Sequence, residues 1–328
     1  MAGEQNVKST VVIPNYNGIS YIEDCIDSLL ADKAKQDFVI VVVDNHSTDG
    51  SRELIQKKYP QVELICFEEN TGFCKAVNAG IAASKTEYVI LLNNDTTVEE
   101  GFVKALEAAM ERHPRAFSVG AKLVDMKNPD VVDDAGDFYC ALGWAFARGT
   151  GKPADKFIEE TEVFSACAGA AIYKRSVFEK IGFFDELHFA YLEDLDIGYR
   201  AKIYGYRNYF TPEAVVHHAG SASSGSRHNA FKVDLSSKNS VYVIYKNMPL
   251  LQQIINLPLF ILGYFVKWLF FLRKGLGNNY AKGVFLGIKR NWSKEAKKHK
   301  IKFKISHLGN YFFIQLELWK NLILRLCY

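Results

Sequence analysis

The chain lacks the glycine-rich turns that mark the commonest nucleotide-binding domains. Its first predicted strand, residues 9–14, runs into Pro14-Asn15-Tyr16-Asn17 instead of a glycine fingerprint, and no Walker sequence is present. Because such glycines let a backbone approach a pyrophosphate, their absence argues against a nicotinamide enzyme and against a P-loop NTPase. Low-complexity tracts and internal repeats are missing too. The 328 residues are enough for one large domain or two smaller ones.

Cysteine spacing also excludes some classes of protein. The six cysteines are Cys25, Cys66, Cys74, Cys140, Cys167 and Cys327. Their spacing matches no metal-binding or redox motif. Scattered cysteines of this kind are typical of a reduced, cytosolic chain. Residues 1–10 are polar and contain no apolar stretch, so we expect no secretory signal there.

Acidic residues are scarce in one part of the chain. Residues 241–328 hold 15 Lys and Arg but only Glu295 and Glu317, whereas residues 1–240 hold 25 Lys and Arg against 35 Asp and Glu. Such asymmetry suggests an attached surface that binds anions, either nucleic acid or anionic lipid. We therefore expect a domain at residues 1–240 and a basic, apolar helical region at residues 241–328.

Hydrophobic periodicity predicts alternating strands and helices in the first part of the chain. The predicted strands are residues 9–14, 38–43, 62–67 and 88–92, and the predicted helices are residues 21–30, 51–59, 73–84 and 98–112. This alternation is typical of a parallel sheet with right-handed crossovers. Residues 118–124 and 162–173 are strand-like, and residues 127–155 are less regular.

The end of the fourth predicted strand carries polar groups suited to a metal ion. Asn93, Asn94 and Asp95 follow the apolar residues 88–92 directly. Ligands of open α/β sheets bind beyond the carboxyl ends of the strands. A carboxylate flanked by amides is suited to a divalent ion that bridges a diphosphate. The alternative is that these residues only form a turn or cap a helix.

Two later segments add titratable groups. Glu193, Asp194 and Asp196 open a predicted helix, where the helix dipole favours acids, so at least one of them has a purely structural explanation. The aromatic residues just before them indicate a carboxylate at a pocket wall. Further on, a strand ends in His217 and His218, and a histidine there is a candidate metal ligand.

Together these motifs resemble family-2 glycosyltransferases of the A-type fold, and more narrowly the bacterial rhamnosyltransferase-like branch that builds O-antigens and cell-wall polysaccharides. The resemblance covers about residues 9–225. It rests on the order and spacing of Ile13-Pro14-Asn15-Tyr16-Asn17, Val43-Asp44-Asn45, Ser47-Thr48-Asp49-Gly50, Asn70-Thr71-Gly72-Phe73, Leu92-Asn93-Asn94-Asp95, Glu193-Asp194-Leu195-Asp196 and His217-His218.

The resemblance implies a fold and a donor site. The fold is a mostly parallel, Rossmann-like nucleotide-binding sheet flanked by helices, with a C-terminal helical extension. Asp44 would bind the base or ribose of a nucleotide-sugar, and Asp95 would lie at its diphosphate. The full set of implied donor-binding residues is Pro14, Asn15, Asn17, Asp44, Asn70, Gly72, Asn78, Asn93, Asn94 and Asp95.

The resemblance also implies a metal-dependent, inverting transfer. Asp95 and a histidine would bind Mn²⁺ or Mg²⁺, and spacing to residues 221–225 favours His218 over His217. Since neighbouring strand residues point to opposite faces, only one of the two histidines can face the metal. Asp194, beside Glu193, would be the general base that takes the proton of the acceptor hydroxyl.

Departures from the family pattern narrow the expected activity. Asn93 stands where the family's Asp-x-Asp motif has its first aspartate. Asparagine at this position is common in the rhamnosyltransferase-like branch, so the resemblance implies dTDP-L-rhamnose as the donor. The Gln-x-x-Arg-Trp signature of processive synthases is absent, which favours transfer of one sugar at a time. The alternatives are another sugar from a UDP donor, or a catalytically weak nucleotide-sugar-binding scaffold subunit.

The basic tail favours a membrane as partner. Residues 254–272 are almost wholly apolar, interrupted by Pro258, Gly263 and Lys267, and basic residues follow. This pattern suits the headgroup region of an anionic membrane better than nucleic acid. We expect peripheral attachment to the inner face of the cell membrane, with a true span or packing against a partner subunit, including a homodimer, as alternatives. A lipid-linked glycan acceptor would suit such attachment.

Overall fold

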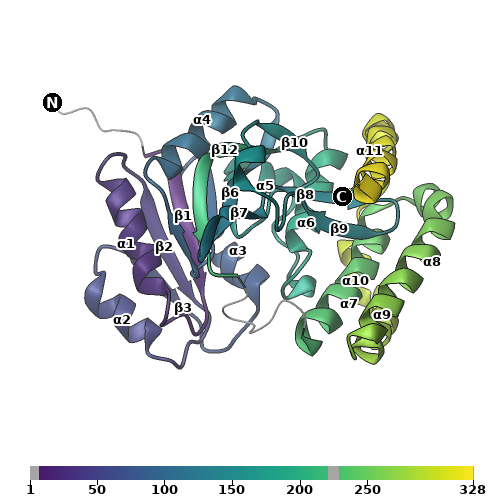
Figure 1. Ribbon diagram of the computed structural model, residues 1–328, viewed down its shortest axis with the longest axis horizontal. Coiled ribbons are helices and arrows are strands. Elements are labelled where there is room, and N and C mark those ends of the chain that lie inside the picture. Colours follow the sequence, from purple (N-terminus) through teal and green to yellow (C-terminus); the bar gives the residue numbers. More distant parts are fainter. Residues whose placement is uncertain (1–6, 221–228, 328) are drawn as a thin grey trace.

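The predicted alternation of strands and helices builds the first part of the fold. The computed structural model describes residues 7–220 and 229–327, so the segment at residues 221–225 lies outside it (Figure 1). The elements up to the fourth strand are β1 (Ser9–Asn15), α1 (Ile22–Lys33), β2 (Val39–Asp44), α2 (Ser51–Lys58), β3 (Glu63–Cys66), α3 (Phe73–Ala83) and β4 (Tyr88–Leu92). Each lies within a few residues of its predicted position.

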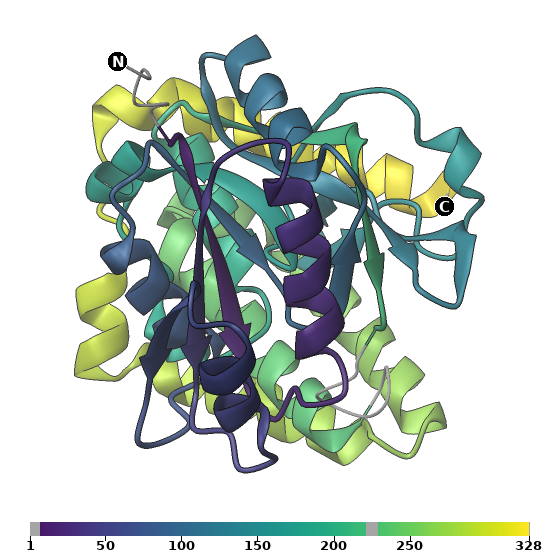
Figure 2. The same ribbon diagram turned by 90° about the vertical axis from the view of Figure 1, so that its left-hand side faces the viewer.

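These strands pair in parallel in the order β4-β1-β2-β3. Strands β1 and β4 are buried almost throughout and contain runs of branched apolar residues, as expected for strands covered on both faces. Helices pack on both faces, since one apolar core joins the sheet to α1 and α4 and a second joins it to α3, α5 and α6 (Figure 2). The carboxyl ends of the strands therefore form one open edge.

The remaining strands complete a ten-stranded sheet of order β10-β12-β6-β11-β4-β1-β2-β3, with β5 beside β12 and β7 beside β6. Strand β11 runs antiparallel between β4 and β6, and β12 runs parallel to β6. The elements are β5 (Thr96–Val98), α4 (Phe102–Arg112), β6 (Ala116–Asp125), β7 (Asn128–Asp134), β8 (Asp137–Cys140), β9 (Trp144–Ala147), β10 (Thr161–Val163), β11 (Ala170–Lys174), α5 (Arg175–Ile181), α6 (Glu193–Ile203) and β12 (Arg207–His218). The predicted fold class, an α/β sheet flanked by helices, is confirmed.

Three local predictions were wrong, and distant pairing explains each. The helix predicted at residues 98–112 begins only at Phe102, because residues 96–98 form β5 against the end of β12. The strand-like residues 162–173 are two separate strands, since β10 pairs with β12 and β11 with β4. The stretch at residues 127–155 contains β7, β8 and β9, of which the last two form a hairpin.

The C-terminal region is helical, as predicted. It comprises α7 (Ala230–Asn247), α8 (Leu250–Arg273), α9 (Gly277–Asn291), α10 (Lys294–His299) and α11 (Leu308–Cys327). These helices lie at the end of the molecule away from α1 and α2 (Figure 1). They share an apolar core with the β8–β9 hairpin and α6, in which Tyr139, Tyr199 and Leu318 are buried. Residue 240, the predicted domain boundary, falls inside α7, and the division into two domains stays a prediction.

Candidate active site

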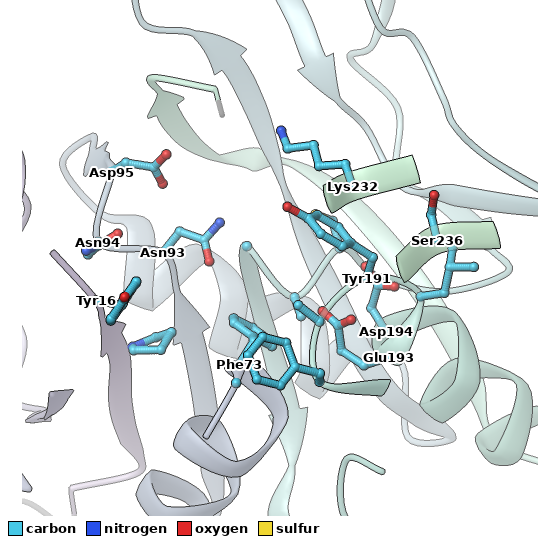
Figure 3. Close-up of a pocket in the computed structure, with 18 of the residues that line it drawn as sticks. Tyr16, Phe73, Asn93, Asn94, Asp95, Tyr191, Glu193, Asp194, Lys232 and Ser236 are labelled. Atoms are coloured by element: carbon cyan, nitrogen blue, oxygen red, sulfur yellow. The ribbon is translucent and has the colours of Figure 1, made fainter. Parts of the chain in front are cut away.

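The carboxyl edge of the sheet opens into one cavity of about 590 Å³, within the usual size range of small-molecule sites. Figure 3 shows Asn93, Asn94 and Asp95 on one side of it and Glu193 and Asp194 on the other. The polar groups that follow β4 therefore face the acids that open α6, although about 100 residues of chain separate them.

Most of the predicted site residues line this cavity. They are Pro14, Asn15, Asn70, Gly72, Asn93, Asn94, Asp95, Glu193, Asp194 and His218. Of the predicted donor-binding residues, Asn17, Asp44 and Asn78 are not among the described residues that line it. The roles assigned to all of these residues stay predictions.

Asn15 joins the ends of three strands. Its Nδ2 donates to Oδ1 of Asp44 at 3.0 Å, and its Oδ1 accepts from Nδ2 of Asn94 at 2.8 Å. Gly18 lies against this pair, because a Cβ there would meet Asn94 Nδ2 at 2.1 Å. The predicted Pro-Asn-Tyr-Asn-Gly loop therefore packs tightly enough to fix both asparagines at the cavity edge.

Asn45 and Gly72 shape the wall beyond β2 and β3. Asn45 Nδ2 donates to Asn70 Oδ1 at 3.0 Å and to the carbonyl of Gly72 at 3.2 Å, while its Oδ1 accepts from Thr71 N–H at 2.9 Å. Gly72 has φ +85°, and a Cβ there would meet the carbonyl oxygen of Phe189 at 2.7 Å. Only glycine allows this backbone conformation and this close approach together.

The three predicted donor residues outside the cavity brace its surroundings. Asp44 is fully buried and accepts from Ser47 N–H at 3.1 Å as well as from Asn15. Asn17 Oδ1 accepts from Thr48 N–H at 2.9 Å. Asn78 holds both backbone groups of Phe184, through contacts of 2.8 and 3.0 Å. In this structure these side chains position loops.

His218 faces Asp95 across the junction of β5 and β12. The Nε2 atom of His218 lies 3.4 Å from Oδ1 of Asp95, and its Nδ1 lies 2.7 Å from Oδ2 of Asp133. Strand register explains this contact, because His218 pairs with Thr96 and the carbonyl of Asp95 accepts from Ala219 N–H at 2.9 Å. Burial opposes the protonation of His218, but its hydrogen bonds to Asp133 and Asp95 outweigh burial and raise its pKa to about 10.

His217 points to the opposite face of the strand. Its Nε2 lies 2.9 Å from Oε1 of the exposed Glu99, and His217 is not among the described residues that line the cavity. The period of two along a strand therefore separates the two histidines, as predicted, and places His218 on the side of Asp95.

Glu193 and Asp194 open α6 at the cavity wall. Asp194 Oδ1 accepts from Leu195 N–H at 2.7 Å, and burial raises its pKa although backbone N–H groups partly oppose the shift. Burial and the neighbouring charge of Asp194 raise the pKa of Glu193 to about 8. Oε2 of Glu193 has no hydrogen-bond partner among the described residues. Two carboxyl groups with raised pKa values in a cavity are typical of acid–base chemistry.

A second acidic group went unrecognised in the sequence. Ligand atoms of Asp134, Asp137 and Cys167 all lie within 4.8 Å of one another, and Asp137 and Cys167 line the cavity. Burial raises the pKa of Asp134 to about 7. The sequence pattern that could have revealed this acidic group is the three aspartates at residues 133, 134 and 137. They lie in a stretch that was predicted to be irregular. Asp134 ends β7 and Asp137 begins β8, so the connection between these two strands brings the acids to the site.

Helix α7 also contributes to the cavity, which the sequence did not indicate. Phe231, Lys232 and Ser236 line it from the start of this helix (Figure 3). Lys232 is the only lysine or arginine among the described lining residues. The first turns of α7, just before the basic, apolar region, therefore complete the site, and Lys232 brings a positive charge to a cavity lined by four carboxylates.

Asp196, the last acid of the Glu-Asp-x-Asp motif, has a structural position. It is fully buried, and its Oδ2 accepts from Lys246 Nζ at 2.7 Å and from Arg200 Nε at 3.0 Å. Lys246 also donates to Asp185 at 2.7 Å. This buried network ties α6 to α7, so one of the three acids is structural, as the sequence analysis allowed.

Comparisons with known proteins identify the family of the chain. The model of the family "Glycosyl transferase family 2" matches residues 10–182. Over 210 residues the chain is 29% identical to the N-acetylglucosaminyl-diphospho-decaprenol L-rhamnosyltransferase of Mycobacterium tuberculosis, an alignment that covers 57% of this chain and 68% of that protein.

Solved structures share the fold at low sequence identity. GalNAc-T7 with UDP, GalNAc and Mn²⁺ matches with a TM-score of 0.60 and 19% identity over 74% of this chain and 48% of that one. The mannosyltransferase PcManGT from Pyrobaculum calidifontis, in complex with GDP-Man and Mn²⁺, matches with a TM-score of 0.55 and 15% identity over 95% of this chain and 88% of that one. These likenesses confirm the predicted A-type fold.

Proposed function

This chain belongs to glycosyl transferase family 2, in its bacterial rhamnosyltransferase-like branch, and we propose that it transfers L-rhamnose from dTDP-L-rhamnose to a hydroxyl group of a lipid-linked glycan. The observation that carries this proposal is that Asp95 and His218 line the same cavity as Glu193 and Asp194. In such a cavity, the side with Asp95 and His218 can hold a charged leaving group, and the side with Glu193 and Asp194 can supply a base.

The donor would lie along the strand ends. One wall of the cavity consists of side-chain amides and of backbone, from Asn15, Asn45, Asn70 and Gly72. Such a wall suits the nucleobase and ribose of a nucleotide-sugar. The diphosphate would then lie towards Asp95, where Lys232 supplies positive charge from α7 (Figure 3). Charged hydrogen bonds to phosphate oxygens are among the strong ones, so Lys232 would contribute to diphosphate binding.

The donor set fits a hard divalent ion. Asp95 and His218 are close enough to share one ion, and the surrounding groups are mainly carboxylate and amide oxygens, which Mg²⁺ and Mn²⁺ prefer. When bound, Mn²⁺ or Mg²⁺ would neutralise charge on the departing diphosphate. Asp95 and His218 would hold it, and His218 would have to lose its Nε2 proton to do so.

The residues of α6 would perform the proton transfer. Asp194 would accept the proton of the acceptor hydroxyl while the acceptor oxygen bonds to the anomeric carbon and the bond to the diphosphate breaks. Attack from the side opposite the diphosphate inverts the configuration at that carbon. Glu193, whose pKa is raised, would stay protonated up to a higher pH and so leave Asp194 as the charged base.

The C-terminal helices support attachment to a membrane. Exposed apolar side chains cover α8 and α11, among them Leu250, Leu251, Ile254, Ile261, Leu262, Phe265, Phe312, Phe313, Trp319 and Ile323. Helix α8 is long and apolar enough to cross a membrane. Residues 241–328 also carry the strongly basic balance expected of a surface that binds anionic lipid.

Contacts on the buried side of α8 favour a helix that lies on the membrane. Asn256 and Gln315 exchange two hydrogen bonds, of 2.8 and 2.9 Å, between α8 and α11. Trp144 of the β8–β9 hairpin donates to the carbonyl of Gly263 at 3.0 Å. We therefore propose that residues 241–328 form a peripheral attachment region, that residues 1–240 carry out catalysis, and that the protein works at the cytoplasmic face of the membrane.

The hairpin also supports a lipid-linked acceptor. Its residues Asp137 and Ala145 line the cavity, while Trp144 contacts α8. An acceptor anchored in the bilayer would thus approach along the side of the cavity that is nearest to the attachment region.

Thermal stabilisation by nucleotides tests the proposal. Ligands that bind only the folded state raise its melting temperature according to their affinity. The panel is dTDP, dTDP-rhamnose, UDP, UDP-glucose and GDP, each with and without Mn²⁺. We expect a Mn²⁺-dependent shift with the thymidine compounds; a uridine preference would favour a UDP-sugar donor, and no shift with any compound would favour a scaffold subunit.

A further inference from the structure

The cavity wall just before the catalytic acids has an unusual backbone. Phe189, Tyr191 and Leu192 all have positive φ angles, of 63°, 70° and 67°. Such angles are rare for bulky residues, and they persist only where the surroundings hold the chain in place. All three residues line the cavity, and Glu193 and Asp194 follow them directly. Contacts with neighbouring residues must therefore keep this loop, residues 188–192, in its conformation.

A single amide from α7 holds the loop. Nδ2 of Asn239 lies 3.0 Å from the carbonyl oxygen of His188 and 2.8 Å from those of Ala190 and Tyr191. Asn239 is fully buried. Its amide nitrogen therefore contacts three carbonyl oxygens of this loop.

Arg290 of α9 orients that amide. Its Nη2 donates to Oδ1 of Asn239 at 3.0 Å, which leaves both N–H groups of the amide for the loop. Its Nη1 donates to the carbonyl of Leu187 at 2.7 Å, at the entrance to the same loop. The guanidinium thus connects α9, α7 and the loop through donors in one plane.

We propose that Asn239, oriented by Arg290, is a positioning residue that keeps the loop at residues 188–192 in its positive-φ form and so places Tyr191 and Asp194 in the cavity. The inference rests on the proposed function, because the reaction gives this placement its importance. The loop reaches the donor wall as well, since the carbonyl of Phe189 accepts from Cys74 N–H at 3.3 Å.

An isosteric substitution tests the inference. Asn239→Asp keeps the shape of the side chain and its contact with Arg290, but it replaces the two donors that face the carbonyls with an acceptor. The matched control is Asn321→Asp. Asn321 is also buried on a C-terminal helix and donates to a backbone carbonyl, that of Tyr139 at 3.0 Å, away from the loop.

Two measurements read out the result. The first is amide hydrogen exchange of peptides covering residues 186–195, and the second is the slow hydrolysis of dTDP-rhamnose, in which water replaces the acceptor. Asn239→Asp should speed exchange in the loop about tenfold. It should lower kcat for hydrolysis by about tenfold to a hundredfold, with a much smaller change in KM, because the loop leads directly into the base Asp194 but contacts the nucleotide wall only through Phe189. Asn321→Asp should leave both loop exchange and kcat unchanged.

Unchanged loop exchange in Asn239→Asp would overturn the inference, and so would faster exchange with unchanged kcat. If Asn239→Asp does not accumulate as folded protein, Arg290→Lys, at a half-buried position, should change exchange and kcat in the same directions. A wild-type protein that neither binds nor hydrolyses nucleotide-sugars would refute the proposed function, whereas the exchange result alone decides whether Asn239 holds the loop.

Discussion

Oδ1 of Asp95 and Nε2 of His218 lie 3.4 Å apart, although 122 residues of chain separate them along the sequence. Their contact depends on the antiparallel register of β5 and β12, which pairs Thr96 with His218. A carboxylate and an imidazole that face each other at a cavity edge suit one shared metal ion. The contact therefore gives the proposed metal site a definite place that can be tested.

His218→Ala should abolish the Mn²⁺ dependence of nucleotide binding, because it removes a proposed ligand. Isothermal titration of dTDP with and without Mn²⁺ measures the effect. The control is His217→Ala, since His217 contacts Glu99 on the opposite face of the same strand. Equal behaviour of the two variants would place the metal elsewhere.

Asp194→Asn should keep donor binding and lose transfer. The amide cannot take up a proton, while its size and its position at the start of α6 are retained. We expect kcat for dTDP-rhamnose turnover to fall by about 10²- to 10⁴-fold with little change in the Kd for dTDP. Normal turnover in this variant would exclude Asp194 as the base.

Lys232→Gln should weaken binding of nucleoside diphosphates more than that of monophosphates. Loss of one charged contact to phosphate should raise the Kd for dTDP about tenfold. The Kd for dTMP, which lacks the second phosphate, should rise less. Lys297→Gln, on the exposed last turn of α10, is the control. An equal loss for both nucleotides would mean that Lys232 does not contact the second phosphate.

Glu193→Gln should stabilise the protein increasingly as pH rises from about 4.5 to about 8. The folded state raises the pKa of Glu193 from 4.5 to about 8, so in this range the folded state binds more protons than the unfolded state and loses stability with rising pH. Glutamine removes this loss. Thermal unfolding at pH values across the range measures the difference, and a constant difference would contradict the raised pKa.

Ile261→Glu combined with Phe265→Glu should release the protein from vesicles. Both side chains are exposed on α8, at 65% and 54%, so the fold should tolerate the change. Truncating the chain near residue 245 is a poorer test, because the C-terminal helices share a core with α6.

Cosedimentation with vesicles of phosphatidylglycerol and phosphatidylcholine measures attachment, and Ile158→Glu is the control at an exposed position outside the C-terminal region. Full binding of the double variant would refute attachment through α8. Loss of binding at high salt in the wild type would indicate that the basic residues contribute, since salt screens exposed charges.

Local patterns in the sequence determined the strand-and-helix order of the first part of the fold, and most of the site residues predicted from them line the cavity. Strands such as β4 are continuous apolar runs, and polar residues such as Asn93 and Asp95 mark where they end. The alternation of side chains along a strand also predicted that His217 and His218 point to opposite faces. These features depend on neighbours in sequence, and that is why a sequence can reveal them.

Tertiary structure alone decided which further residues reach the cavity. Asp137 arrives on a hairpin, Lys232 on α7, and the loop before Asp194 takes its shape from Asn239. Conversely, Asn78, which was predicted to contribute to donor binding, donates to and accepts from the backbone of Phe184. These placements depend on strand register and helix packing between segments far apart in the chain. No periodicity or motif spacing encodes such contacts locally, because they arise only when the segments share a core.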